Sequence, residues 1–364
     1  MKIAIFSDPH LGYQRFEEDS YIQAQRTIED ANEKADLVIC AGDIFDVKIP
    51  KLETLKRAID IFNKAKKPII AIHGNHERRT KDSVNPVQLL QSATKIKILH
   101  GDSTVFEHNG EKVQVFGLGS VPEEYAAKAL EKTLEKFVPD KEAVRILVLH
   151  QSIKELMPDA EEEISLDYLE SLPFDLIING HIHESVTKLD GRFIIPGSTV
   201  ITQLKKEQMK SRGYILYDSK TKKSEFVDIK SRKFFYEELS FDCANRDEIR
   251  SRVKARVEEI RKNDPGAIIA IKLLGKMKEG MKSSDLAVDE YVDVYIDNKF
   301  EEGDLKTKLE KLKFFREENL GAKDVAIKEL VKKLEGKITL DSRELFEKLL
   351  IGVDETVEYL ERKE

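Results

Sequence analysis

Lys2-Ile-Ala-Ile-Phe-Ser7 is a short aliphatic run that ends directly in Asp8-Pro9-His10. Such a run is typical of a buried parallel strand, and polar residues follow where that strand ends. The same arrangement recurs along the first half of the chain. The further predicted strands, each with its polar cluster, are 36–40 with Gly42-Asp43, 68–72 with Gly74-Asn75-His76, 145–149 with His150-Gln151, and 175–178 with Gly180-His181-Ile182-His183. We therefore expect these polar side chains to converge on one rim of one sheet.

The segments between these strands predict an α/β domain. Residues 21–34 and 52–66 carry apolar residues at helical spacing, and each leads into the next aliphatic strand. Right-handed crossovers of this kind cover a sheet with helices on both faces. The other predicted elements are a hairpin at 103–108 and 112–118, a helix at 123–137, and short strands at 185–189, 192–195, 214–218 and 224–229. Residues 1–230 are thus expected to form one domain whose two sheets pack face to face.

The rest of the chain predicts two further parts. Residues 231–300 show a pattern that favours a small α+β accessory domain over an extension of the first core. Its expected elements are a strand at 234–241, a helix at 246–262, and strands at 267–274 and 290–296. Residues 301–364 are charged and helical in pattern, and one apolar stripe recurs at every fourth residue: Leu345, Leu349, Val353 and Val357. This stripe predicts either packing within the protein or a binding site for another chain.

Composition narrows the class of protein. The 364 residues are 40% hydrophobic and 35% charged, and no apolar run approaches the roughly 20 residues that cross a bilayer. We expect no signal peptide, because the chain opens directly into the first predicted strand, and Cys40 and Cys243 match no disulfide framework. We therefore expect a cytoplasmic protein without a membrane partner. The net charge of −7 argues against binding nucleic acid over the whole surface, but local basic patches remain candidates for DNA binding, chiefly Arg78, Arg79 and Lys81 beside the third polar cluster, and also 205–212.

The polar clusters contain a set of potential metal ligands. These are four histidines, two aspartates and one asparagine: Asp8, His10, Asp43, Asn75, His150, His181 and His183. A carboxylate can bridge two cations, and imidazoles mixed with hard oxygens suit manganese, iron or zinc. A lone histidine at a strand end is more often structural, and we expect that of His73, His100 and His108. Five clusters in order, however, predict a site for two divalent ions.

These motifs resemble those of the calcineurin-like metallophosphoesterase superfamily. Asp8-x-His10, Gly42-Asp43, Gly74-Asn75-His76, His150 and Gly180-His181-x-His183 match its pattern in order. Within it, Asp8-Pro-His-Leu-Gly12 and Asn75-His76-Glu77 look like the SbcD-type nucleases of double-strand-break repair. The resemblance covers residues 1–230 by motif. By layout alone, 231–300 is similar to that family's DNA-capping domain and 301–364 to its ATPase-binding segment.

The resemblance implies a two-metal DNA exo/endonuclease in which hydrolysis uses a metal-activated water. It implies two Mn²⁺ ions per chain, the first held by Asp8, His10, Asp43 and His183 and the second by Asp43, Asn75, His150 and His181. His76 is implied to face the scissile phosphate. The resemblance also implies three partners: DNA ends, a second copy of the chain in a homodimer, and an SMC-like coiled-coil ATPase of the SbcC type. The ATPase is implied to dock on Leu345, Leu349, Val353 and Val357.

Two positions depart from the family's pattern. Asp46 stands where many relatives carry His or Asn, and Glu184 stands where a basic residue is common. We therefore expect a contact to DNA, or a hydrogen bond to one of the metal ligands, to differ from that in the family. One rival function is a phosphomonoesterase or small-molecule phosphodiesterase of the same superfamily, which would share every ligand without needing the accessory parts. Another is an inactive scaffold, against which the complete ligand set argues.

Overall fold

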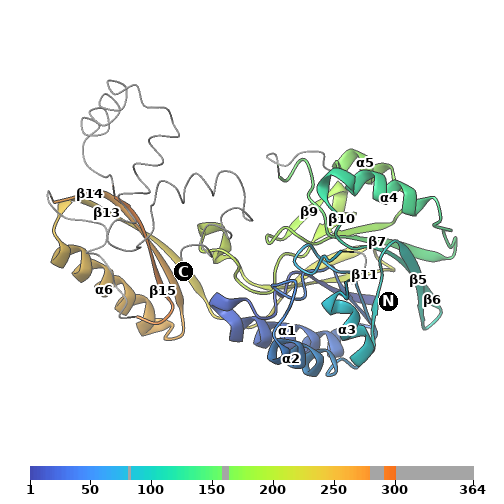
Figure 1. Cartoon of the computed structure of the whole chain (residues 1–364), viewed down its shortest axis with the longest axis horizontal. Coiled ribbons are helices and arrows are strands. Elements are labelled where there is room, and N and C mark those ends of the chain that lie inside the picture. Colours follow the sequence, from blue (N-terminus) through green and yellow to red (C-terminus); the bar gives the residue numbers. More distant parts are fainter. Residues whose placement is uncertain (81–82, 158–163, 279–290, 301–364) are drawn as a thin grey trace, which may run out of the picture. The chain divides into compact units, whose positions relative to one another are not determined.

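Two six-stranded sheets with helices on their outer faces make up most of the protein (Figure 1). The computed structural model describes residues 1–80, 83–157, 164–278 and 291–300. It divides into two compact units, and the first, which contains Met1–Glu237 and Val253–Lys272, carries both sheets. Among the described residues, the second contains Glu238–Arg252, 273–278 and 298–300. The predicted α/β architecture of two sheets flanked by helices is confirmed.

The first sheet has the strand order β12-β11-β1-β2-β3-β4. Its strands are β1 (Lys2–Phe6), β2 (Leu37–Cys40), β3 (Ile69–Ala71), β4 (Ile96–Ile98), β11 (Gly213–Asp218) and β12 (Lys223–Asp228). Strands β1 to β4 run parallel, whereas β11 is antiparallel to both of its neighbours. The parallel strands are connected by α1 (Glu17–Lys34), α2 (Leu52–Phe62) and α3 (Pro86–Ala93).

The second sheet has the strand order β5-β6-β7-β8-β10-β9. Its strands are β5 (Asp102–His108), β6 (Glu111–Leu118), β7 (Ala143–Leu149), β8 (Leu176–Asn179), β9 (Val186–Lys188) and β10 (Phe193–Ile195). Its centre is parallel, and the edge strands β5 and β9 are antiparallel to their neighbours. Helices α4 (Ala126–Leu134) and α5 (Leu166–Ser171) cover its outer face (Figure 1).

The cores follow from the alternation of side chains along each strand. On β1, Ile3 and Ile5 enter the core between the two sheets, whereas Ala4 and Phe6 enter the core under α1, α2 and α3. Successive strand residues point to opposite faces, so a strand with no polar residue must be covered on both sides. The result is four layers, in the order helices, sheet, sheet and helices.

Three elements, α3, β4 and α5, lie where the sequence pattern predicts none. Helix α3 begins with a capping box in which the Asn85 side chain accepts from the Val87 N–H at 3.0 Å and Gln88 Oε1 accepts from the Asn85 N–H at 3.1 Å. Pro86 occupies the first turn, where its missing N–H costs nothing. The helix predicted at 123–137 is a 3₁₀ turn, Glu123–Tyr125, followed by α4.

The prediction that all five ligand-bearing strands share one sheet is wrong. Strands β1, β2 and β3 lie in the first sheet, and β7 and β8 lie in the second. The ends of the two sets still meet, because Nδ1 of His150, just after β7, lies 2.7 Å from the main-chain oxygen of Ala41, just after β2. A buried strand of either sheet has the same continuous aliphatic pattern, so the pattern alone cannot assign strands to sheets.

A third sheet follows, with the strand order β13-β14-β15. Its elements are β13 (Phe234–Ala244), α6 (Arg246–Asn263), β14 (Ile268–Met277) and β15 (Val294–Phe300). The last strand lies later than the predicted 290–296, because a turn occupies the residues just before it. No described helix is long and apolar enough to span a membrane. The predicted domain boundaries remain predictions, and residues 301–364 with the stripe Leu345, Leu349, Val353 and Val357 lie outside the described residues.

Candidate metal centre

The predicted ligands lie on loops that leave the carboxyl ends of β1, β2, β3, β7 and β8. The first two of these loops run side by side and are joined by main-chain hydrogen bonds. The Asp8 N–H donates to the Gly42 oxygen at 3.0 Å, and the His10 N–H donates to the Asp43 oxygen at 3.1 Å. These bonds extend the pairing of β1 and β2 into the site, so the ligands sit on a fixed backbone.

Four of the ligand residues adopt a left-handed backbone conformation. Their φ angles are 52° at Asp8, 44° at His10, 49° at Asp43 and 75° at His181. This region costs a residue with a Cβ roughly 1 kcal/mol, and such residues gather at functional sites. Left-handed turns, rather than the pleat of a continuing strand, therefore aim the side chains of Asp8 and His10.

Two glycines make room for the ligands. A Cβ on Gly42, whose φ is +95°, would lie 2.5 Å from Nδ1 of His150. A Cβ on Gly74 would lie 1.9 Å from Oδ1 of Asp43. Both contacts are far below van der Waals distance, so the backbone at these two positions approaches the neighbouring side chains as closely as only glycine allows.

The first group of ligands surrounds His10. Its Nε2 lies 3.2 Å from Nε2 of His183 and 3.9 Å from Oδ2 of Asp43. Oδ1 of Asp8 lies 3.8 Å from the same nitrogen of His183. Asp8, His10 and His183 can each offer one atom within 4.8 Å of the others, as one cation requires.

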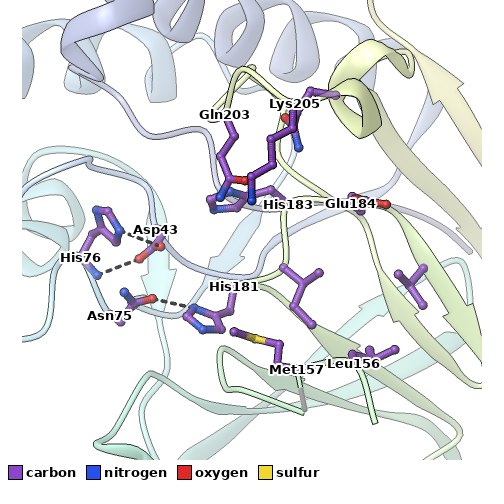
Figure 2. A pocket seen from close by; sticks show the side chains of 13 residues that line it. Asp43, Asn75, His76, Leu156, Met157, His181, His183, Glu184, Gln203 and Lys205 are labelled. Carbon is purple, nitrogen blue, oxygen red and sulfur yellow. Dashed lines mark hydrogen bonds and ion pairs between the residues drawn. The ribbon is translucent and has the colours of Figure 1, made fainter. Parts of the chain in front are cut away.

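The second group surrounds Asn75, and Asp43 belongs to both groups. Oδ1 of Asn75 lies 3.0 Å from Nε2 of His150 and 2.9 Å from Nδ1 of His181. Oδ2 of Asp43 lies 3.3 Å from Nε2 of His150. Figure 2 shows Asp43 beside His76 and above Asn75, with His181 and His183 opposite. The structure thus brings all seven predicted ligands together.

These groups fit divalent cations by their chemistry. Carboxylate, amide and imidazole groups converge here, and Oδ2 of Asp8 is buried without a hydrogen-bond partner among the described residues. Burial, reinforced by Asp43, raises the pKa of Asp8 to about 6. Burial alone would lower the pKa of His150, but the carboxylates of Asp43 and Asp8 raise it to about 9. Protons must offset these buried charges in the metal-free protein, and cations can replace them.

Two of the other candidate ligand histidines, His181 and His183, are neutral in this environment. Burial lowers the pKa of His181 to about 4, with the charge of His150 adding to the effect. Burial and His10 lower the pKa of His183 to about 3. Both rings therefore offer lone pairs near pH 7, as metal coordination requires.

His76 lies at the edge of the centre and is held from two sides. Its main-chain N–H donates to Oδ1 of Asp43 at 2.9 Å, and its Nδ1 lies 2.6 Å from the main-chain oxygen of Asp46. Because that oxygen can only accept, Nδ1 carries the proton, and Nε2 is the nitrogen that faces the centre, 3.9 Å from Oδ2 of Asp43. The side chain is 37% exposed, so a substrate can reach it. His10, Asp43 and His76 also form a group with metal-ligand spacing, which makes the role of His76 a matter for experiment.

Other residues form hydrogen bonds to the candidate ligands or to the loops that carry them, and the sequence pattern does not single them out for this role. The Thr202 hydroxyl lies 2.6 Å from Nδ1 of His183, and the Ser152 hydroxyl lies 3.3 Å from Nε2 of His181. Glu77 is fully buried and accepts from the N–H groups of Phe45 and Gly74, each at 2.6 Å. Burial and the nearby Asp43 raise the pKa of Glu77 to about 8. Glu77 belongs to the family motif Asn75-His76-Glu77, whereas no local sequence pattern marks Thr202 or Ser152.

The predicted DNA-binding patch lies beside the centre in part. Arg78 lines a cavity of about 310 Å³ together with Asn75 and His181. The Arg79 guanidinium donates to the Lys48 main-chain oxygen at 3.2 Å. Lys81 lies outside the described residues.

Comparison with known proteins identifies the family. The calcineurin-like phosphoesterase model matches residues 1–185. Double-strand break repair protein MRE11 of Encephalitozoon cuniculi is 28% identical over 302 residues, covering 71% of this chain and 52% of that protein. DNA double-strand break repair protein Mre11 of Archaeoglobus fulgidus is 27% identical, covering 66% and 61%. One component of the nuclease SbcCD of Staphylococcus epidermidis is 27% identical, covering 60% and 66%.

The chain spans about half the length of the first of these relatives and 61% of the second. The family model, by contrast, covers half of the chain itself and includes all ligand positions from Asp8 to His183. By this match, the protein belongs to the calcineurin-like phosphoesterase family.

Proposed function

We propose that the protein is a manganese-dependent DNA nuclease that hydrolyses phosphodiester bonds with two divalent ions and acts in double-strand-break repair. The observation that carries the proposal is the convergence of seven nitrogen and oxygen ligands around Asp43. The relatives named as break-repair proteins support the substrate class.

Each residue of the centre has a role in this proposal. Asp8, His10, Asp43 and His183 would hold one ion, and Asp43, Asn75, His150 and His181 the other. Bound divalent cations supply positive charge that neutralises a phosphodiester and lowers the pKa of a water molecule. The protein contributes a fixed ligand backbone and neutral imidazoles.

His76 would act on the substrate rather than on a cation. Its Nδ1–H is engaged by the Asp46 carbonyl, so Nε2 points toward the centre with the ring orientation fixed. In its protonated form, Nε2–H can donate to a phosphate oxygen on which negative charge develops during displacement.

Two cavities support a diester substrate over the rival phosphomonoester. One, of about 580 Å³, is lined by His183 and by side chains that include Met157, Ile182, Gln203 and Lys205, and Figure 2 shows Gln203 and Lys205 extending toward His183. The second is the cavity of about 310 Å³ at Arg78. Asn75 and His181 line both cavities. If the phosphate of a diester lies at these residues, the two cavities provide space for the groups attached on either side of it.

The test compares substrates and metals with purified protein. Linear duplex DNA, bis(p-nitrophenyl) phosphate and p-nitrophenyl phosphate are each incubated with manganese, magnesium or chelator. We expect cleavage of DNA and of the diester, strongest with manganese and abolished by chelator. Efficient hydrolysis of the monoester alone would favour the rival function.

Metal content provides the companion measurement. The parent should approach two manganese ions per chain, and Asp43→Asn should lose most of both, because Asp43 contacts both ligand groups. Asp60→Asn is the control, since Asp60 is an exposed residue on α2 paired with Lys56. Full occupancy in Asp43→Asn would contradict the shared ligand.

We further propose a homodimer. Leu52 on α2 and Leu89 on α3 are 79% and 44% exposed, unusually high values for large apolar side chains. Light scattering should give a dimer for the parent and a smaller species for a Leu52→Glu/Leu89→Glu variant. Lys56→Glu, also on α2, is the control and should keep the parent mass.

A further inference from the structure

Asp46 contacts two histidines of the metal centre through different groups. Its main-chain oxygen lies 2.6 Å from Nδ1 of His76. Its carboxylate Oδ1 lies 3.3 Å from Nδ1 of His10 and 3.8 Å from Nδ1 of His76. One residue therefore touches a predicted metal ligand with its side chain and the predicted phosphate-facing residue with its backbone.

The backbone of Asp46 is fixed by the two parallel loops. Its N–H donates to the Leu11 oxygen at 3.2 Å, and the Leu11 N–H donates to the Ile44 oxygen at 2.8 Å. Leu11 also forms a parallel bridge with Phe45, and both side chains are fully buried. The position of the Asp46 carbonyl thus depends on main-chain pairing and not on its own side chain.

Within the part of the chain that the structure describes, the carboxylate that lies near Nδ1 of His10 is that of Asp46. This nitrogen is buried and has no regular hydrogen bond among the described residues, although Asp46 lies within ion-pair distance. Nε2 of the same ring faces His183 and Asp43. If Nε2 binds a cation, the proton of the neutral ring sits on Nδ1, and a buried N–H without an acceptor is costly.

The other ligand rings have neutral partners. Nδ1 of His150 faces the Ala41 carbonyl, Nδ1 of His183 faces the Thr202 hydroxyl, and Nε2 of His181 faces the Ser152 hydroxyl. Among these described contacts, His10 is the ring whose second nitrogen faces a carboxylate. A carboxylate in this position orients the imidazole and makes it a stronger ligand.

We propose that Asp46 is a positioning residue that holds His10 for a divalent cation through its carboxylate, while its main-chain carbonyl separately holds His76. This proposal rests on the proposed metal-dependent function. A substitution of Asp46 removes the carboxylate and leaves the main-chain carbonyl, so its effect on His10 can be measured separately from any effect on His76.

The test measures manganese binding by calorimetry with Asp46→Ala and Asp46→Asn in the full chain. Asp46→Ala should weaken binding of one of the two ions by about 10- to 100-fold, the usual effect of removing such an outer partner. Asp46→Asn keeps an acceptor oxygen and should lose less. Hydrolysis of bis(p-nitrophenyl) phosphate by Asp46→Ala at saturating manganese should fall far less than in His76→Ala, since the carbonyl remains.

Glu184→Gln is the matched control. Glu184 adjoins His183 in the chain, and its carboxylate pairs with Lys210 at 3.2 Å instead of a ligand ring. The variant removes the same charge from the neighbourhood and should change manganese affinity by less than about twofold. Thermal unfolding without metal checks that every variant is folded. If Asp46→Ala does not fold, Asp46→Asn is used for the test in its place.

Three outcomes would overturn the proposal: parental manganese affinity in both Asp46 variants, equal weakening in Glu184→Gln, or an Asp46→Ala rate at saturating manganese as low as that of His76→Ala. Because binding is measured without substrate, a parent that binds manganese but cleaves no diester would refute the proposed function and leave the role of Asp46 standing.

Discussion

At the scale of single residues, two neighbours in the chain can have different chemical roles because their side chains meet different partners. Asn75 and His76 are neighbours, yet the Asn75 side chain meets His150 and His181, whereas the His76 ring turns toward Asp46. The predicted difference in role between adjacent residues therefore has a geometric basis. It is open to test because His76 also has ligand spacing with His10 and Asp43.

His76→Ala should keep both manganese ions and lose cleavage. The seven ligands remain, so metal content and binding of DNA ends should stay near those of the parent. The rate of DNA cleavage should fall by a factor on the order of 10² to 10⁴, the usual contribution of one positioned acid or transition-state donor. His108→Ala, an exposed histidine on β5, is the control. Loss of one ion in His76→Ala would make it a ligand, and a parental rate would make it a bystander.

His73 predicts a pH dependence of stability. Burial, helped by His100, lowers its pKa to about 4 from the ordinary value of 6.5. Above pH 6.5 both the folded and the unfolded states are neutral at this residue. As the pH falls toward 4 the unfolded state takes up the proton first, so stability is lost across that window, by up to about 3 kcal/mol.

The measurement is urea unfolding of chelator-treated protein between pH 7 and 4, for the parent and His73→Gln. A glutamine can still donate to the Ser120 oxygen, which lies 3.2 Å from Nε2 of His73, but does not titrate. The free energy of unfolding of the variant should therefore fall less on acidification. Parallel pH curves would show that His73 does not contribute.

At the scale of elements, the strands could be predicted and the conformation of the loops could not. The run from Lys2 to Phe6 is aliphatic on both faces, which suffices to predict a buried strand. The left-handed turns at Asp8, His10 and Asp43 occur at residues with a Cβ. Asp and His adopt this conformation more often than most residues, but residue type alone does not predict it at a given position. The partners of the ligand rings, such as Thr202 on His183, come from distant segments and depend on tertiary packing.

Short elements escaped prediction because their signals overlap with those of turns. Asn85-Pro86 is ordinary turn chemistry, but here it starts α3, since Gln88 completes a capping box. Helix α3 is only eight residues long, too short for a clear apolar period. Its existence depends on the cap and on burial of Val87 and Leu90.

Asn85→Ala should lower the free energy of unfolding by about 1 kcal/mol, the usual effect of removing a side-chain cap. The measurement is urea unfolding followed by circular dichroism. Ser92→Ala, near the end of the same helix, is the control. Ser92 is exposed and bonds only to the Gln88 carbonyl one turn earlier, so its loss should have little effect. Equal effects would show that the cap adds nothing specific.

At the scale of the whole molecule, the convergence of the seven candidate ligands was predictable because they follow a chemical pattern in sequence order. Which sheet supplies each ligand was not, since β3 and β7 present the same aliphatic pattern in different sheets. The site thus belongs to the interface between the two sheets, where loops from both can approach.

The stripe Leu345, Leu349, Val353 and Val357 is the predicted surface for a coiled-coil ATPase, and truncation after Gly336 tests it. The truncated protein should lose co-purification with an SbcC-type ATPase but keep manganese-dependent cleavage, because every ligand precedes residue 184. A Leu349→Glu/Val353→Glu variant of the full chain should have the same effect, since buried charge opposes docking of an apolar helix face.

Glu347→Gln is the control for the stripe, because residue 347 lies roughly 160° from Leu349 around an α-helix of 3.6 residues per turn. Its co-purification with the ATPase should equal that of the parent. If the truncated protein instead aggregates or loses manganese, the stripe packs on the rest of the protein and not on a partner. If truncation preserves co-purification, the ATPase binds elsewhere on the chain.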